Sequence, residues 1–299
     1  IKESGYEVDL LYWDRDCVNG EKEDFFGCNN IAFQYYLDNR SSFFRKLKGY
    51  LVTRKFIQKQ LKKEHYKGLI FLQSHTAVAF LNLVCKQYKQ RYIIDIRDYS
   101  LENNRLFFNL ESRVIRNSYK AVISSPAYTK FLPKGDYIIA HNYMPFKNVE
   151  NAIRKNFDKM HPIRIAFIGK VRFIDMDKKI LDIFANDDRY VICYYGIGSN
   201  VLSEYAEKSG YKNVDFHDSF PPEDTLNFYS NVTLINNIYG NNDIYLDYAL
   251  SNKLYNAAQL RIPILVSPDT FMEEITRKYD IGISVDVNNK QTPDLIYRW

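Results

Sequence analysis

The segment IRIAFIGK, residues 163–170, shows how the chain is organised. It is a short apolar run that ends in a glycine and a cation, which is typical of a buried strand leading into a turn. It follows a polar stretch, residues 147–161, that ends at Pro162. Strand-like runs with helical patterns between them occur on both sides of that stretch, at residues 7–13, 69–72, 92–96, 121–124 and 137–140 before it, and at 163–168, 190–195, 214–216, 232–236, 264–266 and 282–284 after it.

Strands that alternate with helices predict parallel sheets joined by right-handed crossovers. One of the helices is predicted at residues 105–118, where Leu106, Leu110 and Val114 share one face. Two such sets of elements predict an α/β protein made of two Rossmann-like domains that face a cleft. The expected boundaries are an N-terminal domain over residues 1–146, a linker over 147–161 and a C-terminal domain over 162–299.

The composition is that of a folded globular protein. Of the 299 residues, 46% are hydrophobic and 26% are charged, which excludes disordered, collagen-like and coiled-coil chains. No apolar run reaches the roughly 18 to 20 residues needed to span a bilayer. The four cysteines form no C-x-x-C pair and no dense framework, which favours reduced thiols and a cytoplasmic location.

One segment carries the whole positive charge balance of +5. Eight basic residues and no acidic residue lie between Arg45 and Lys63, and the rest of the chain has 33 basic against 36 acidic residues. Because the positive charge is confined to this one segment, it does not favour nucleic-acid binding, which needs a basic face across a whole domain. Because Phe43 and Phe44 adjoin these cations, residues 43–63 have two interpretations. They form either a basic amphipathic helix on the inner membrane face or a solvated helix packed on a sheet.

The usual cofactor and metal motifs do not occur. Gly196-Ile197-Gly198 follows a predicted strand, but Val201 stands where the dinucleotide motif G-x-G-x-x-G requires its third glycine. There is no Walker A sequence, and the five histidines are never paired at i, i+4 as in helical zinc sites. Two D-x-D matches, at residues 14–16 and 175–177, are too short to be specific. We therefore expect neither a bound cofactor nor a metal site.

A first anion-binding segment is predicted at the end of the 163–168 strand. Gly169 allows a ligand to approach the backbone closely, because it carries no side chain. Lys170 and Arg172 follow, and a helix is expected to begin near Met176. A diphosphate at this point would meet two cations and a helix N-terminus. The alternative interpretation is a turn glycine followed by two solvated cations.

A second anion-binding segment is predicted at the start of the next helix pattern, which runs through Leu260. Ser251 or Asn252 can cap this helix, and Lys253 lies in its first turn. A cation at a helix N-terminus is unfavourable for the helix dipole. Its presence beside a good capping residue therefore suggests an anion that both of them bind.

Two candidates for acceptor chemistry lie in the first half of the chain. His75 follows the 69–72 strand, and Asp98 follows the 92–96 strand. Both are expected at the carboxyl edge of a parallel sheet, where α/β proteins bind ligands, so either could orient an acceptor hydroxyl or take its proton. In the structural alternative, Asp98 forms a salt bridge with Arg97 or Arg105, and His75 caps its helix.

Four segments in order resemble bacterial sugar-nucleotide glycosyltransferases of the GT-B fold, especially family-four-like enzymes of capsule and exopolysaccharide synthesis. They are GYEVDLLYW (residues 5–13), YIIDIRD (92–98), IAFIGK (165–170) and SNKLYNAAQLRIPILV (251–266). The resemblance covers nearly the whole chain. It implies that a first strand precedes residue 5 and that a last helix, which crosses back to the first domain, follows Trp299.

The resemblance also implies roles for individual residues. In the family's Pro-x-Lys-x-x-Glu segment, the Lys contacts the donor diphosphate and the Glu holds the ribose hydroxyls. Lys253 matches the Lys, whereas Ser251 replaces the Pro and Asn256 stands in place of the Glu. Asn256 can still hydrogen-bond a hydroxyl, but without a charge-assisted bond. The loop at residues 240–248 would lie near the donor sugar, and it lacks the first Glu of the family's E-x7-E pair.

With the resemblance, these observations predict a metal-independent, hexosyltransferase-like enzyme that moves a sugar from a nucleoside diphosphate sugar to a surface glycan or lipid-linked glycan, and a UDP-sugar is the expected donor. The donor residues would be Gly169, Lys170, Arg172, Ser251, Asn252, Lys253 and Asn256, with Asp98 and His75 facing the acceptor. Two alternatives remain. One is nucleotide-sugar epimerisation, and the other is a non-catalytic sugar-nucleotide-binding or scaffold subunit, which the missing glutamates favour.

Overall fold

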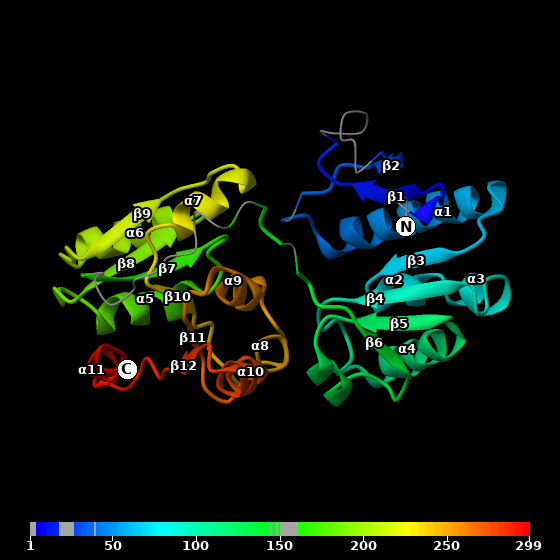
Figure 1. Ribbon diagram of the computed structural model, residues 1–299. Coiled ribbons are helices and arrows are strands. Elements are labelled where there is room, and N and C mark those ends of the chain that lie inside the picture. Colours follow the sequence, from blue (N-terminus) through cyan, green and yellow to red (C-terminus); the bar gives the residue numbers. More distant parts are fainter. Residues whose placement is uncertain (1–3, 18–26, 39, 144, 148, 150–160) are drawn as a thin grey trace. The chain divides into compact units, whose positions relative to one another are not determined.

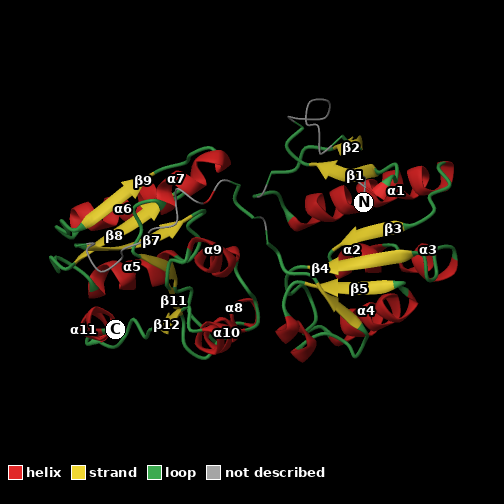
Figure 2. Ribbon diagram, viewed as in Figure 1, coloured by secondary structure: helices red, strands yellow, loops and turns green. Residues whose placement is uncertain are grey.

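The structure, a computed structural model, describes all residues except 1–3, 18–26, 39, 144, 148 and 150–160. Most of the predicted linker over residues 147–161 therefore lies outside the described residues. By its contacts the chain divides into two compact units, one made of Ile1–Asp95 and Ser100–Ala121 and the other of Ile96–Tyr99 and Val122–Trp299. Strands and helices alternate along the chain, as Figure 2 shows in yellow and red.

The first half of the chain contains two small sheets (Figure 1). β1 (Asp9–Asp14) pairs in parallel with β2 (Asn29–Gln34). β1 was predicted from the sequence at residues 7–13, whereas β2 was not predicted. The other sheet has the order β3-β4-β5-β6, and β3 pairs in parallel with β4. Its strands are β3 (Leu69–Leu72), β4 (Tyr92–Ile96), β5 (Lys120–Ile123) and β6 (Tyr137–Ile139). The helices of this half are α1 (Phe43–Lys63), α2 (Ser74–Ala79), α3 (Leu81–Lys86) and α4 (Arg105–Asn117), with a 3-10 helix at Pro126–Lys130.

The buried face of α4 differs from the predicted one. Leu106 is 70% exposed, and the helix buries Phe107, Glu111, Val114 and Ile115 instead. The predicted buried face of this helix is therefore wrong at Leu106, which is exposed, and correct at Val114, which is buried. The reason is that α2 and α3 pack against a face turned by one residue, and this face includes an acidic side chain.

The second half forms one six-stranded sheet of order β12-β11-β10-β7-β8-β9, and the pairs of this sheet are parallel. Its strands are β7 (Ile163–Ile168), β8 (Tyr190–Tyr195), β9 (Val214–His217), β10 (Leu234–Asn237), β11 (Ile264–Val266) and β12 (Gly282–Ser284). These positions match the predicted strands to within two residues, so the α/β class with parallel sheets is confirmed.

Helices cover both faces of this sheet. One face of β7 and β8 packs in a core with α5, α6 and α11, and the other packs with α7, α9 and α10. Their bounds are α5 (Ile174–Ile183), α6 (Ser199–Lys208), α7 (Thr225–Tyr229), α9 (Asn252–Leu260), α10 (Phe271–Tyr279) and α11 (Thr292–Arg298), with the short α8 at Ile244–Asp247 and a 3-10 turn at Pro222–Asp224. Because β7, β8 and β11 are buried on both sides, they read as apolar runs that only Arg164 interrupts.

No helix in the described part of the chain combines the length and apolar character needed to cross a membrane. The four cysteines are all unpaired.

Candidate functional site

The structure brings the two predicted anion-binding segments together. β7 ends at Ile168, and Gly169 follows it with a φ of +132°, a conformation that residues with side chains rarely adopt. A Cβ atom at Gly169 would lie 3.7 Å from the Nζ atom of Lys253, which comes from the first turn of α9. The ammonium group of Lys253 therefore lies close to the glycine at the carboxyl end of a central parallel strand, the position at which α/β sheets bind ligands.

Lys253 is buried to an unusual degree for a lysine, since only 9% of it is exposed. Its Nζ atom lies 3.0 Å from the hydroxyl of Tyr239 and 4.0 Å from the centre of the Phe167 ring. Burial lowers the pKa of Lys253 to about 8, while Asp177 raises it and Arg172 lowers it. Lys253 is thus still mainly cationic at pH 7, and its charge is only partly solvated.

Asp177 is a member of this site that sequence reasoning missed. It lies in the first turn of α5, it is 1% exposed, and burial raises its pKa to about 7. In the sequence, Asp177 stands out only as part of the D-x-D match at residues 175–177. Among the described residues, no group of three His, Cys, Asp or Glu side chains is arranged to hold a metal ion. The carboxyl group acts instead on the charge of Lys253, which no sequence spacing indicated.

Tyr239 is the second member that sequence reasoning missed. It follows β10 and precedes Gly240, where the loop of residues 240–248 begins with a φ of +98°. Its hydroxyl contacts Lys253, and burial raises the pKa of Tyr239, so the phenol stays neutral. In the sequence, a tyrosine after a buried strand has the pattern of a core residue. Only the contact with Lys253 places Tyr239 in the candidate site.

The glycines of the Gly196-Ile197-Gly198 segment support the site through the backbone. Gly196 has a φ of +131°, and a Cβ atom there would lie 2.3 Å from the carbonyl oxygen of Gly169. Gly198 stands at the N-cap of α6. The segment therefore supports the Gly169 turn by close backbone packing.

The N-terminus of α9 departs from the expected capping. Ser251 occupies the N-cap, but its side chain does not accept a bond from the helix and instead donates to Oδ1 of Asn237 at 2.7 Å. Asn252, the other predicted cap, is the first residue of the helix. Ser251 is therefore the N-cap residue by position, as expected, but its side chain forms no capping bond and is held by Asn237 on β10 instead. Further along α9, Nδ2 of Asn256 donates to the hydroxyl of Tyr229 at 3.1 Å.

Lys170 and Arg172 both lie exposed on the segment between β7 and α5. The charge of Arg172 acts on Lys253, so this cation belongs to the same electrostatic site. α5 begins at Ile174, two residues before the predicted start near Met176.

The two acceptor candidates lie at strand ends in the first half of the chain. His75 is the second residue of α2, and its Nδ1 atom lies 2.9 Å from Oγ of Ser100. Partial desolvation of the ring lowers the pKa of His75, so the imidazole is neutral at pH 7. Asp98 follows β4 and is exposed. None of the ion pairs given for the described residues involves Asp98.

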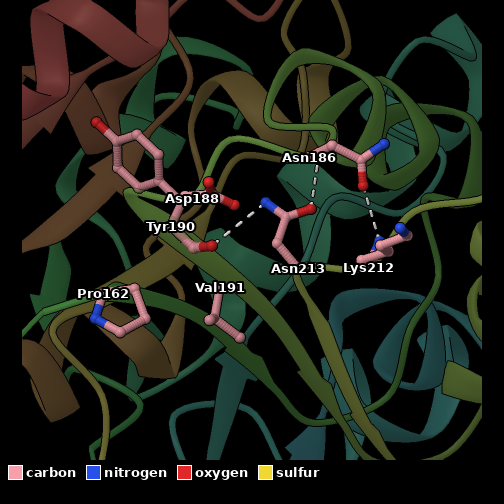
Figure 3. Close-up of a pocket in the computed structure, with 7 residues that line it drawn as sticks. All are labelled: Pro162, Asn186, Asp188, Tyr190, Val191, Lys212 and Asn213. Atoms are coloured by element: carbon pink, nitrogen blue, oxygen red, sulfur yellow. Dashed lines mark hydrogen bonds between the residues drawn. The ribbon is translucent and has the colours of Figure 1, made fainter.

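A separate cavity of about 550 Å³ is lined by residues near the starts of β8 and β9 (Figure 3), and Gly169 is not among its lining residues. Its polar side chains bind each other and the backbone. Oδ1 of Asn213 accepts from the backbone N–H of Asn186 at 2.8 Å, and Oδ1 of Asn186 accepts from the backbone N–H of Lys212 at 2.9 Å. Because these groups are satisfied and lie at the amino ends of the strands, the cavity is not the favoured site.

No family model and no curated protein matches the sequence. The fold is nevertheless that of solved glycosyltransferases of the GT-B class. Sucrose-phosphate synthase from Thermosynechococcus elongatus is similar over 99% of this chain and 80% of its own, with a TM-score of 0.72 and 12% identity. A glycosyltransferase from Rickettsia africae is similar over 98% and 87%, with a TM-score of 0.63 and 11% identity.

HepE from Anabaena, solved in complex with UDP, is similar over 90% of this chain and 76% of its own, with a TM-score of 0.62 and 11% identity. At such low identities the similarity establishes the fold. The function has to be argued from the site.

Proposed function

We propose that this protein is a glycosyltransferase that takes its sugar from a nucleoside diphosphate sugar, with UDP as the favoured nucleotide. The observation that carries the proposal is the position of Lys253, whose buried ammonium group faces Gly169 at the carboxyl end of β7. A partly desolvated cation beside an open backbone turn suits a diphosphate, since phosphate oxygens form strong charge-assisted bonds with it. The UDP complex of the similar HepE structure supports the choice of nucleotide.

In the proposed reaction, the bond between the anomeric carbon and the diphosphate oxygen breaks as an acceptor hydroxyl attacks. Negative charge then develops on the leaving diphosphate. Lys253, Arg172 and the N-terminus of α9 would stabilise that charge, so that electrostatic stabilisation supplies the main catalytic effect without a metal ion. Lys170, Ser251, Asn252 and Asn256 are the other donor-side residues of the proposal.

The acceptor side of the proposal lies in residues 1–146, and the donor side in residues 162–299. His75, which is neutral at pH 7, is suited to accept the proton of the acceptor hydroxyl, and Asp98 is the second candidate. The family-four-like resemblance extends the proposal to hexosyl transfer in capsule or exopolysaccharide synthesis, with a glycan or lipid-linked glycan acceptor at the cytoplasmic face of the membrane.

Nucleotide binding tests this proposal without knowledge of the acceptor. We expect one nucleoside diphosphate among UDP, GDP, CDP and ADP to raise the melting temperature, and NAD to have no effect. A ligand at 100 times its dissociation constant adds about 2.7 kcal/mol, which corresponds to roughly 5–10 °C for a domain of this size. Thermal unfolding of the full chain measures the shift. If none of the four diphosphates shifts the melting temperature, the proposed donor site is wrong.

The first turns of α1 support membrane association as part of the proposal. Phe43 and Phe44 are 73% and 80% exposed, and Leu47 and Leu51 are also exposed. The cations Arg45, Lys46 and Lys48 are interspersed with them. Apolar and basic side chains that alternate on an exposed helix fit an anionic lipid surface, to which each surface-near cation contributes about 1 kcal/mol.

We therefore expect the protein to sediment with vesicles that contain phosphatidylglycerol and to be released by salt. The double substitution Phe43→Ser and Phe44→Ser should weaken this binding at least tenfold, because it removes the apolar contact. Leu106→Ser, which changes an equally exposed apolar residue on α4, is the matched control. Equal binding to neutral phosphatidylcholine vesicles, or equal binding by the double variant, would contradict the membrane interpretation.

A non-catalytic sugar-nucleotide-binding subunit is the second candidate, because Asn256 stands in place of a glutamate and donates its amide to Tyr229. Binding of UDP-sugar without turnover would favour this function. Turnover of UDP-sugar in the absence of any acceptor would instead favour epimerisation.

A further inference from the structure

The hydroxyl group of Tyr239 has an unused hydrogen in the candidate site. Its oxygen lies 3.0 Å from Nζ of Lys253. An ammonium group has only donors, so Lys253 donates in this bond and the phenol oxygen accepts. The hydroxyl hydrogen takes no part in the bond, and no described residue accepts it. Tyr239 is partly buried, where polar groups are usually paired, so this hydrogen is available to a bound ligand.

Lys253 is also short of acceptors. It is 9% exposed, and the Tyr239 oxygen is the one hydrogen-bond acceptor that the described residues offer to its three N–H groups. None of the ion pairs given for the described residues includes Lys253, so Asp177 acts on its charge without forming an ion pair. Two neighbouring side chains thus present more donors than acceptors, which suits an anionic ligand.

The aromatic rings around Lys253 determine from which side an anion can reach these donors. Nζ lies 4.0 Å from the centre of the Phe167 ring, which covers that side. The Tyr239 ring packs edge-on against Phe167, with the ring centres 6.1 Å apart, and against Phe173 at 5.0 Å. Gly169 has no side chain, and a Cβ atom there would lie 3.7 Å from Nζ. The open approach to Lys253 is therefore over the Gly169 turn.

The two donors are close enough to bind one anionic group together. The Tyr239 oxygen and Nζ of Lys253 are 3.0 Å apart, and charge-assisted hydrogen bonds are about 2.5–2.9 Å long. Packing on Phe167 and Phe173 fixes the phenol ring before any ligand arrives. A diphosphate over the Gly169 turn would thus meet an ammonium group and a phenol side by side, both already in place.

We propose that Tyr239 contacts the donor's diphosphate directly, accepting a hydrogen bond from Lys253 and donating its own hydrogen to a diphosphate oxygen. Tyr239 is then a catalytic residue beside Lys253. As the bond between the anomeric carbon and the diphosphate oxygen breaks, its electron pair stays on that oxygen, and the phenol hydrogen bond stabilises the added charge. Burial raises the pKa of Tyr239, so the phenol shares its proton without releasing it. This inference rests on the proposed function for the identity of the ligand.

Tyr239→Phe tests the contact, because it removes the hydroxyl and keeps the ring that packs on Phe167 and Phe173. We expect the dissociation constant for UDP to rise about 10-fold or more, the effect of losing a hydrogen bond to a charged group. Isothermal titration of the full chain measures this change. Tyr190→Phe is the matched control, since it removes a completely buried hydroxyl from the same sheet, one that donates to the carbonyl of Pro293. It should bind UDP as the wild type does.

A second pair of variants separates direct contact from positioning of Lys253. In a Lys253→Met background, Tyr239→Phe should still raise the dissociation constant for UDP at least about threefold, because the phenol keeps its own bond to the diphosphate. A residue that acts only by holding the ammonium group would have no effect in that background. Equal affinities of Lys253→Met and the double variant would therefore overturn the direct contact.

Inorganic pyrophosphate is the second probe, since it keeps the diphosphate and lacks the nucleoside. Its dissociation constant should also rise about 10-fold in Tyr239→Phe. If the wild type binds UDP or pyrophosphate and Tyr239→Phe binds it equally well, the role of Tyr239 is wrong while the glycosyltransferase proposal stands. If the wild type binds pyrophosphate but none of the four nucleoside diphosphates, only the proposed function is wrong. If it binds neither, both are wrong.

Discussion

Replacing Lys253 with methionine is expected to remove the thermal shift that a nucleoside diphosphate produces. Methionine keeps the unbranched apolar stem beside Phe167 and removes only the ammonium group. A charge-assisted hydrogen bond contributes about 1.5–3 kcal/mol, so the dissociation constant should rise by about 10- to 150-fold. Isothermal titration with the nucleotide identified by the melting panel measures this change.

The pH dependence of binding provides a second measure of the same cation. Because burial lowers the pKa of Lys253 to about 8, the charged form declines as the pH rises through that value. Nucleotide affinity of the wild type should therefore fall between pH 7 and 9, whereas the residual affinity of Lys253→Met should not show this fall. Lys208→Ala, an exposed lysine on α6, should bind as the wild type does. An unchanged dissociation constant in Lys253→Met would remove the basis of the proposed donor site.

Replacing Gly196 with alanine is expected to have the largest effect on stability. The residue has a φ of +131°, and the added Cβ atom would lie 2.3 Å from the carbonyl oxygen of Gly169. The cost combines backbone strain of about 1–3 kcal/mol with a steric overlap of similar size. We expect about 3 kcal/mol or more in total, which lowers the melting temperature by roughly 10 °C. Nucleotide affinity should also fall, since the Gly169 turn must shift to admit the added methyl group and so changes its position relative to Lys253.

Gly210→Ala separates these two contributions. Gly210 also has a positive φ, of +71°, but no atom lies within 4 Å of its added Cβ. This control should therefore lose only the backbone term, about 1–2 kcal/mol. If Gly196→Ala melts no lower than Gly210→Ala, the close packing of the two glycine turns does not contribute to stability.

The strands of the second half were predictable because they are buried on both faces. β7 and β8 coincide with the predicted runs at 163–168 and 190–195, since Arg164 is the only charged residue in these two strands and the other residues are apolar or aromatic. β2 was not predicted, because Asn29–Gln34 has only three central apolar residues between polar ones. Its strand conformation comes from pairing with β1, a contact that the local sequence does not indicate.

The candidate site was predictable where backbone chemistry demands a residue type. Gly169 and Lys253 were both identified from the sequence, because a glycine after a buried strand and a cation at a helix start each violate an ordinary preference. Tyr239 and Asp177 were not identified, since a tyrosine and an acid in these positions violate none. Ser251 was correctly predicted as an N-cap residue, but its hydroxyl donates to Asn237 on a neighbouring strand and forms no capping bond.

The sequence by itself determined the α/β class, the order of the strands along the chain and the two segments of the proposed anion site. These depend on the period and polarity of neighbouring residues. Only the tertiary structure decided that Lys253 is desolvated beside Tyr239, that Asp177 acts on its charge, and that Glu111 lies inside the core. Burial and charge coupling depend on which distant segments come together, and electrostatic effects in a protein are strong only where those segments exclude water.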